Sequence, residues 1–137
     1  MKRKYFNKNI NKNRNGIIYK ITHINILEIV YIGSTMCRLN TRWKRHKKGY
    51  SSWINGYTKN KCSICPYFKQ YGIKNFKCTE LKKYKVTCVK QLSVYEQLWL
   101  NKIKNINKNK VFSPNKFYMK YYKKNIKLEE RLGKIKI

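Results

Sequence analysis

Acidic side chains are scarce in this sequence: five glutamates and no aspartate stand against 34 lysines and arginines in 137 residues. The formal net charge at pH 7 is therefore +29. A surface so strongly of one sign repels itself and implies an anionic partner. Nucleic acid is the first candidate and an anionic membrane surface the second. Lys, Asn, Ile and Tyr are abundant together, as an A/T-rich gene would encode, so part of the excess has a mutational explanation.

Long apolar runs are also missing, and we expect no secretory leader. No apolar run approaches the length of a membrane span, so we expect no membrane partner. The start, Met1-Lys2-Arg3-Lys4, is basic, but no apolar segment follows it. We therefore expect a protein that is not secreted and works in an intracellular, reducing setting. The five cysteines then predict thiols rather than disulfides, and the lone Cys62-x-x-Cys65 pair favours packing over a four-ligand zinc site.

The apolar pattern predicts one α+β domain, a small sheet with helices packed on it. The connection between the first two strands is too short for a crossover helix, which favours an antiparallel sheet. Gly49 and Gly72 stand where helices are expected to stop. We expect strands at 17–22, 28–33 and 76–86, helices at 40–48, 63–71 and 89–103, a basic arm at 1–15, the domain at 16–112 and a basic helical extension at 113–137.

A nucleic-acid partner raises the question of whether the chain holds the groups for phosphodiester hydrolysis. A hard divalent cation takes carboxylate oxygen, and Glu96 is the one glutamate inside a strongly amphipathic helix, near its buried edge. A carboxylate there is costly without a partner. One such ligand argues for one metal ion rather than two. The alternative is a helix glutamate paired with one of the many lysines.

Two further pairs of residues fit the same chemistry. Arg42 and His46 lie one turn apart and share a helix face, where they suit phosphate recognition and proton transfer. The alternative is a solvated basic face, which includes Arg45. Tyr19 and Tyr31 lie on adjacent predicted strands, and a tyrosine becomes a base only where cations such as Arg42 or a metal lower its pKa.

These pieces resemble the GIY-YIG endonuclease family in order and spacing. The first motif is Gly16-Ile17-Ile18-Tyr19, one residue longer than the plain form, and the second is Tyr31-Ile32-Gly33, followed by Ser34 and Thr35. Arg42 and His46 fit the first helix of the family, and Tyr95-Glu96-Gln97 fits the helix that carries its metal-binding glutamate. Asn107 matches the asparagine that follows that helix, with Asn109 as the alternative. The resemblance covers about residues 15–112.

The resemblance implies a central three-stranded antiparallel sheet flanked by helices. It also implies that Tyr19 helps to activate the water, that Tyr31 positions water or phosphate, and that Arg42 stabilises the pentavalent phosphate. His46 would assist proton transfer, Glu96 would bind a single Mg²⁺ or Mn²⁺, and Asn107 would hold the site or contact phosphate. From their positions, we expect nucleic-acid contacts at Lys20, Gly33, Ser34, Thr35 and Arg45.

The sequence therefore predicts a divalent-metal-dependent endonuclease that acts on DNA. It has no recognisable sequence-reading module, so we expect weak sequence preference, structured DNA as substrate, or a helper protein. The first alternative is a non-catalytic, basic nucleic-acid-binding protein on the same scaffold. The second is a basic protein of a membrane surface or a ribosome. Whether the protein is a monomer or a homodimer is left open.

Overall fold

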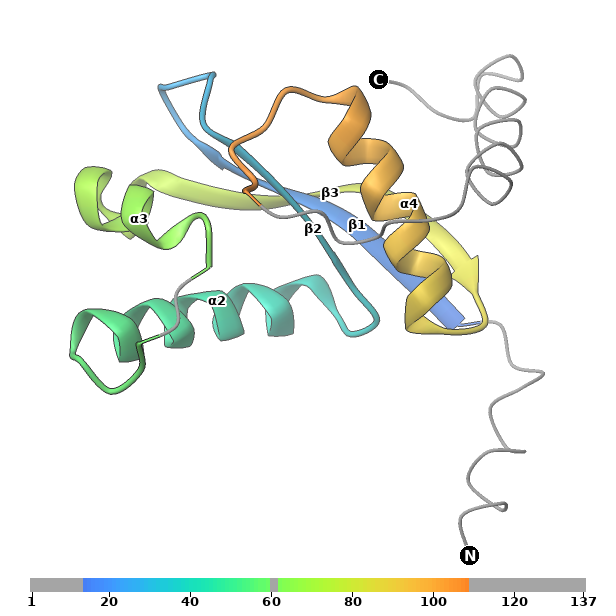
Figure 1. Cartoon of the computed structure of the whole chain (residues 1–137), viewed down its shortest axis with the longest axis horizontal. Coiled ribbons are helices and arrows are strands. Elements are labelled where there is room, and N and C mark those ends of the chain that lie inside the picture. Colours follow the sequence, from blue (N-terminus) through green and yellow to red (C-terminus); the bar gives the residue numbers. More distant parts are fainter. Residues whose placement is uncertain (1–13, 60–61, 109–137) are drawn as a thin grey trace, which may run out of the picture.

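The computed structural model describes residues 14–59 and 62–108. Three strands form one antiparallel sheet in the order β2-β1-β3, which confirms the predicted α+β class (Figure 1). Residues 1–13 of the predicted basic arm and all of the predicted 113–137 extension lie outside the described residues, whereas Arg14 and Asn15 belong to the first strand. The elements are β1 (Arg14–His23), β2 (Val30–Thr35), α2 (Leu39–Ile54), α3 (Cys65–Tyr71), η1 (Ile73–Asn75), β3 (Phe76–Val86) and α4 (Val89–Lys102).

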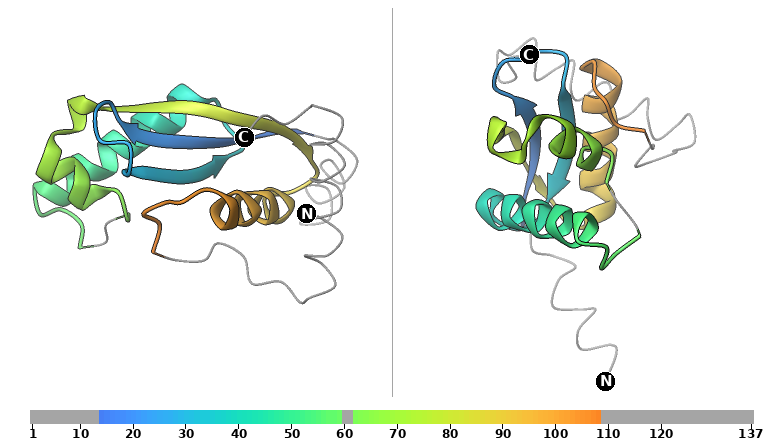
Figure 2. Two further views of the ribbon diagram at one scale, coloured as in Figure 1. Left: turned by 90° about the horizontal axis from the view of Figure 1, so that it is seen from above. Right: turned by 90° about the vertical axis from the view of Figure 1, so that its left-hand side faces the viewer.

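The central strand β1 is buried on both faces, because helices cover both sides of the sheet (Figure 2). Successive side chains of β1 point to opposite faces of the sheet. Ile17, Tyr19 and Ile21 pack in one core with residues of α2 and α3, whereas Ile18 packs in a second core with Leu92 and Trp99. The trace of the chain places α4 against the second core. Alternate side chains of β1 therefore point toward α2 or toward α4. We call these two sides of the sheet the α2 face and the α4 face.

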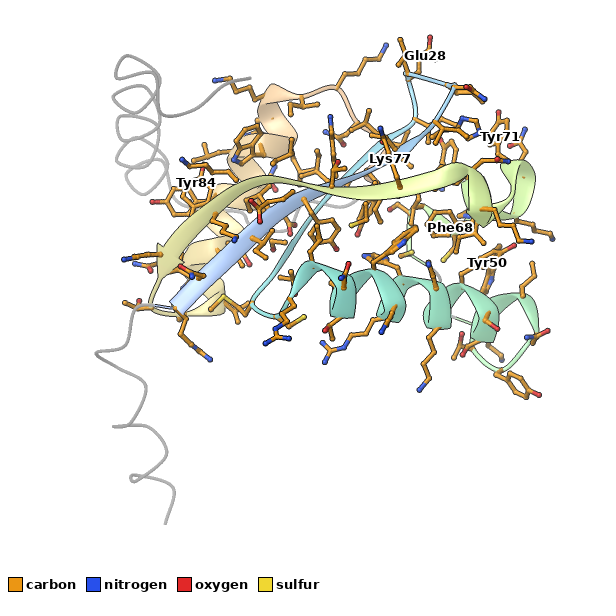
Figure 3. The ribbon with its side chains drawn as sticks, turned by 180° about the vertical axis from the view of Figure 1, so that it is seen from behind. Glu28, Tyr50, Phe68, Tyr71, Lys77 and Tyr84 are labelled. Atoms are coloured by element: carbon orange, nitrogen blue, oxygen red, sulfur yellow. The ribbon has the colours of Figure 1, made fainter. Side chains whose placement is uncertain are left out.

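The long strand β3 contributes to both cores and shifts register between them. Its pairing with β1 is irregular between Ile18 and Tyr19, where one extra residue of β3 is accommodated. Two of the side chains labelled in Figure 3 mark the two cores: Phe68 of α3 lies in the α2-face core, and Tyr84 of β3 lies in the α4-face core. Tyr84 stacks on Tyr95 with ring centroids 3.9 Å apart and accepts a hydrogen bond from Trp99 Nε1 at 3.0 Å.

Most predicted elements are confirmed, with β3 at its predicted bounds, α4 ending one residue early and Pro66 in the first turn of α3. The second strand begins at Val30, two residues later than predicted. The connection before it is longer because the His23 ring nitrogen Nδ1 accepts hydrogen bonds from the backbone N–H groups of Asn25 and Ile26, both at 3.0 Å. No helix within the described ranges is long and apolar enough to cross a bilayer.

The predicted end of the first helix at Gly49 is wrong, because α2 runs on to Ile54. Tyr50 stands one residue beyond that glycine, and its ring meets the ring of Phe68 edge-on with centroids 5.6 Å apart. This contact with α3 holds the next turn in place, so tertiary packing overrides the local preference of glycine for a helix end. The helix begins after Arg38, which makes no side-chain cap bond, rather than at Asn40 or Thr41.

Replacing Gly33 with alanine should destabilise the fold. A Cβ atom at Gly33 would lie 2.4 Å from the hydroxyl oxygen of Tyr19, a side chain with no exposed surface. We expect a loss of about 2 kcal/mol in the free energy of unfolding, measured by urea denaturation. Gly49→Ala is the matched control, since nothing lies within 4 Å of its added methyl group. Equal stabilities of the two variants would contradict the close approach at Gly33.

Candidate active site

Two tyrosines from neighbouring strands meet on the α2 face. Tyr19 of β1 pairs across the ladder with Gly33 of β2, and Tyr31 of β2 pairs with Ile21. Because cross-strand partners share a face, both rings lie in the core under α2 and α3. The ring of Tyr19 lies over Gly33, where an added Cβ would come within 2.4 Å of it. The missing side chain at Gly33 is thus what makes room for the phenol.

The hydroxyl of Tyr19 is held by two residues of α2, which we call, together with it, the Tyr19 cluster: Tyr19, Arg42 and His46. Arg42 Nε donates a hydrogen bond to Tyr19 Oη at 3.1 Å. His46 Nε2 lies 2.7 Å from the same oxygen. Arg42 and His46 are one helical turn apart, so the predicted shared face is confirmed. One phenol thereby fixes both side chains relative to the sheet.

Burial sets the protonation states of the Tyr19 cluster. Desolvation raises the pKa of Tyr19 to about 12, although Arg42 acts in the opposite direction. Burial, followed by the charge of Arg42, lowers the pKa of His46 to about 4. Burial also raises the pKa of Tyr31 well above its ordinary value. At pH 7 both tyrosines and His46 are therefore neutral. Arg42 acts to lower the pKa of Tyr19, as expected, but burial raises that pKa by more.

Aromatic neighbours explain why His46 is only 7% exposed. Its ring meets Tyr19 and Tyr31 edge-on, with centroids 5.8 and 5.7 Å away. Trp43, one turn back on α2, lies 6.5 Å from it and packs on Phe68. Sequence reasoning missed this cover for the histidine. The three-residue spacing between Trp43 and His46 was the available signal.

Glu96 belongs to α4, which packs on the opposite face of the sheet from the Tyr19 cluster. It is 7% exposed, and burial raises its pKa, whereas a hydrogen bond from Ser34 and the charge of Arg42 act to lower it. Ser34 pairs with Ile18, whose side chain lies on the α4 face. The groups that favour the charged carboxylate are thus a serine and an arginine, and neither is a lysine of its own helix.

Asn107 binds the backbone of β2 between Tyr31 and Gly33. Its Oδ1 accepts a hydrogen bond from Ile32 N–H at 3.0 Å, and its Nδ2 donates to Ile32 C=O at 2.8 Å. The side-chain amide thus satisfies edge groups that a fourth strand would otherwise pair. Asn107 is therefore a positioning residue that holds the strand of Tyr31, and the alternative, Asn109, lies outside the described residues.

The structure gives the surroundings of three residues that are predicted to contact nucleic acid, and the contacts themselves stay predictions. Lys20 lies on the α4 face, because it follows Tyr19 in an alternating strand, so it is turned away from that phenol. The space above Gly33 is filled by the Tyr19 ring rather than open to a phosphate. The Thr35 hydroxyl accepts a hydrogen bond from Cys37 N–H at 3.2 Å and lies 2.9 Å from its sulfur, which occupies it in the turn before α2.

A concavity of about 180 Å³ opens beside the cluster and is lined by Tyr31, Arg42, Arg45, His46, Gly49, Cys62 and Cys65. Tyr19 has no exposed surface and lies behind this lining. The sulfur atoms of Cys62 and Cys65 are 3.1 Å apart, as thiols, which agrees with the prediction of no disulfide. Among residues 14–59 and 62–108, no three His, Cys, Asp or Glu side chains gather as a metal-binding group.

Comparison with known proteins gives two relatives, both from Invertebrate iridescent virus 6. The chain is 31% identical over 122 residues to uncharacterized protein 019R, covering 82% of this chain and 41% of that protein. It is 31% identical over 94 residues to putative MSV199 domain-containing protein 146R, covering 69% of this chain and 36% of that protein. The chain thus spans about two fifths of the length of these relatives. No family model and no solved structure matches it.

The buried histidine should make stability depend on acid pH. The pKa of His46 is about 4 in the folded protein and near 6.5 when unfolded, so the unfolded chain binds more protons between these values. Stability should therefore fall by about 3 kcal/mol as pH drops from 6.5 to 4. His46→Gln should remove this part of the slope in urea titrations at each pH. His23→Asn, which changes the other histidine, should keep it.

Removing the Asn107 amide should loosen the edge of the sheet. Asn107→Ala deletes two hydrogen bonds to Ile32 and leaves partly buried backbone groups unpaired. We expect a loss of about 2 kcal/mol in the free energy of unfolding and faster hydrogen exchange at the Ile32 amide. Asn40→Ala, at an exposed position on α2, should cost nothing. Unchanged exchange at Ile32 would show that the amide does not hold β2.

Proposed function

We propose that this chain is a divalent-metal-dependent endonuclease that hydrolyses DNA phosphodiester bonds at the concavity beside the Tyr19 cluster. The observation that carries the proposal is the double contact of Tyr19 Oη with Arg42 Nε and His46 Nε2, at 3.1 and 2.7 Å. It gathers residues from a strand and a helix that lie 23 and 27 positions apart in sequence. The resemblance to the GIY-YIG family implies a site that contains these three residues, and the observed contacts agree with that expectation, which supports the proposal.

Arg42 supplies positive charge where an attacked phosphate would develop negative charge. Its guanidinium is half-buried, lines the concavity and is held through Nε, which leaves its terminal nitrogens as donors for phosphate oxygens. A pre-oriented cation in a site of low dielectric stabilises a pentavalent phosphate more than a flexible one does. Tyr19 acts here as a positioning residue, since it fixes the arginine without touching the substrate.

Proton transfer runs through His46. Arg42 Nε–H donates a hydrogen bond to the phenol oxygen, so the Tyr19 hydroxyl is best assigned as a donor to His46 Nε2. The neutral histidine then carries its own proton on Nδ1. His46 lines the concavity, whereas Tyr19 has no solvent contact. In this arrangement His46 would give its Nδ1 proton to the leaving oxygen, while Nε2 takes the hydroxyl proton of Tyr19 and leaves a phenolate beside Arg42. A proton from the attacking water would return to that phenolate by the same route, by way of the imidazole. The resemblance implies that Tyr19 activates water, and the burial makes that action indirect.

Glu96 is the ligand available for a divalent cation. A lone carboxylate suits Mg²⁺ or Mn²⁺, which keep several waters and take further oxygens from a substrate phosphate. Its raised pKa and its Ser34 partner describe a buried carboxylate that a nearby cation would return to the charged form. Glu96 would hold such an ion, which would polarise the phosphate and lower the pKa of bound water. Arg42, whose charge acts on Glu96, links the two halves of the site.

A non-catalytic nucleic-acid-binding protein is the second candidate. The observation in its favour is burial: Tyr19 has no exposed surface and Glu96 only 7%. A cluster that only holds α2 against the sheet would look the same, and the net charge of +29 would bind DNA without cutting it. The two candidates differ in whether metal-dependent cleavage occurs.

Cleavage should disappear in Glu96→Gln and fall by about two to three orders of magnitude in Arg42→Ala. The glutamine keeps the size of the side chain and its hydrogen bonding to Ser34 but loses the charge that a cation needs. The measurement is nicking and linearisation of plasmid and branched DNA with Mg²⁺, with Mn²⁺ and with EDTA, beside DNA binding in EDTA.

Lys90→Gln, an exposed change on α4, is the control for loss of one charge. Both site variants should bind DNA nearly as well as the wild type. Binding by all proteins with no cutting under any metal would favour the non-catalytic candidate, as would equal cutting by wild type and Glu96→Gln.

A further inference from the structure

Gly49 has no structural reason to be a glycine. It lies inside α2, is exposed, and is not among the positive-φ glycines of the described chain, which are Gly56 and Gly72. A Cβ atom built on it would meet nothing within 4 Å. Alanine would suit this position better, since glycine in a helix interior is unfavourable. The fold therefore gains nothing from the missing side chain.

The position of Gly49 beside two concavities gives a functional reason for a glycine there. It lines the 180 Å³ concavity beside the Tyr19 cluster, and it also lines a second concavity of about 570 Å³. The second concavity, which we call the outer groove, is lined by Arg45, Lys48, Gly49, Ser52, Thr58 and Lys59. Arg45 and Gly49 belong to both linings. The two hollows therefore adjoin along α2, where they share Arg45 and Gly49.

The lining of the outer groove suits a chain of phosphates. It carries three cations and two hydroxyls, and no carboxylate is among its residues. Arg45 and Lys48 are three positions apart and Ser52 follows four later, so they share one face of α2 (the helix at the bottom of Figure 1). All three cations are exposed. Lys59, from the chain beyond α2, adds charge from the opposite wall.

We propose that the outer groove holds the phosphate backbone of a nucleic-acid strand as it leaves the active-site concavity, and that the bare helix surface at Gly49 is where the strand crosses. The proposal rests on the proposed function, because the adjoining hollow is the active site of that function. It extends it by giving the strand a direction: along α2, away from the Tyr19 cluster and toward Lys59. A side chain at position 49 would stand in that path.

The test combines stability with binding, both on the full chain. Gly49→Gln and Gly49→Ala should each raise the melting temperature, by about 2 to 5 °C, because both residues favour helix over glycine. Gly49→Gln should nonetheless weaken binding of a duplex of about 20 base pairs roughly tenfold, measured by fluorescence anisotropy in EDTA. A gain in stability with a loss in binding separates a path for a ligand from a structural glycine.

The cations are tested by the salt dependence of the same binding. The double variant Lys48→Gln/Lys59→Gln should lower the slope of log Kd against log salt by about 2, and Lys90→Gln should leave it unchanged. Wild-type affinity in Gly49→Gln, a lowered melting temperature in Gly49→Ala, or an unchanged slope in the double variant would overturn the proposal.

Failure of the groove can be told apart from failure of the endonuclease. Binding is measured in EDTA, and cutting of the same duplex by the wild type is measured separately with Mg²⁺. If the wild type never cuts DNA and the variants lose binding as expected, the phosphate-binding groove is supported and the endonuclease function is rejected. If the wild type cuts DNA and the variants bind as well as it does, the groove is rejected and the endonuclease function is not. No binding by the wild type removes both.

Discussion

The site depends on one buried hydroxyl. The hydroxyl oxygen of Tyr19 contacts both Arg42 and His46, and it can occupy that place because Gly33 leaves the space above β2 free. A methyl group at Gly33 would push the ring away, and both α2 side chains would lose their common partner. The register of β1 and β2, the position of α2 and the direction of Arg42 are thus coupled through one phenol.

The sequence predicted those parts of the structure that depend on local spacing. Strand patterning placed Tyr19 and Tyr31 on adjacent strands, and the one-turn interval placed Arg42 and His46 on one helix face. The end of α2 was mispredicted because the helix-breaking tendency of Gly49 is local, whereas the contact of Tyr50 with Phe68 is made across the fold. The face of Lys20 followed from the alternation too, but only once the two cores were known.

The pKa values and the partners of the charged side chains could not be predicted from residue spacing. From sequence, Arg42 beside Tyr19 suggested a lowered phenol pKa, yet the desolvation of a side chain enclosed by two helices is the larger effect and raises it. The partner of Glu96 was likewise beyond reach, since Ser34 comes from a strand and Arg42 from another helix. The role of Asn107 was predicted in part: the sequence placed it after α4, but did not predict its two hydrogen bonds to the backbone of Ile32.

In the proposed reaction, substrate binding to Arg42 would change the pKa of the buried, neutral His46. Part of what lowers the pKa of His46 is the positive charge of Arg42. A phosphodiester anion seated on that guanidinium would offset this charge, so the pKa of His46 would rise toward its ordinary value as the substrate binds. The imidazole would then accept a proton more readily with substrate present than without it. The same neighbour that holds the phosphate would thus govern when the proton moves.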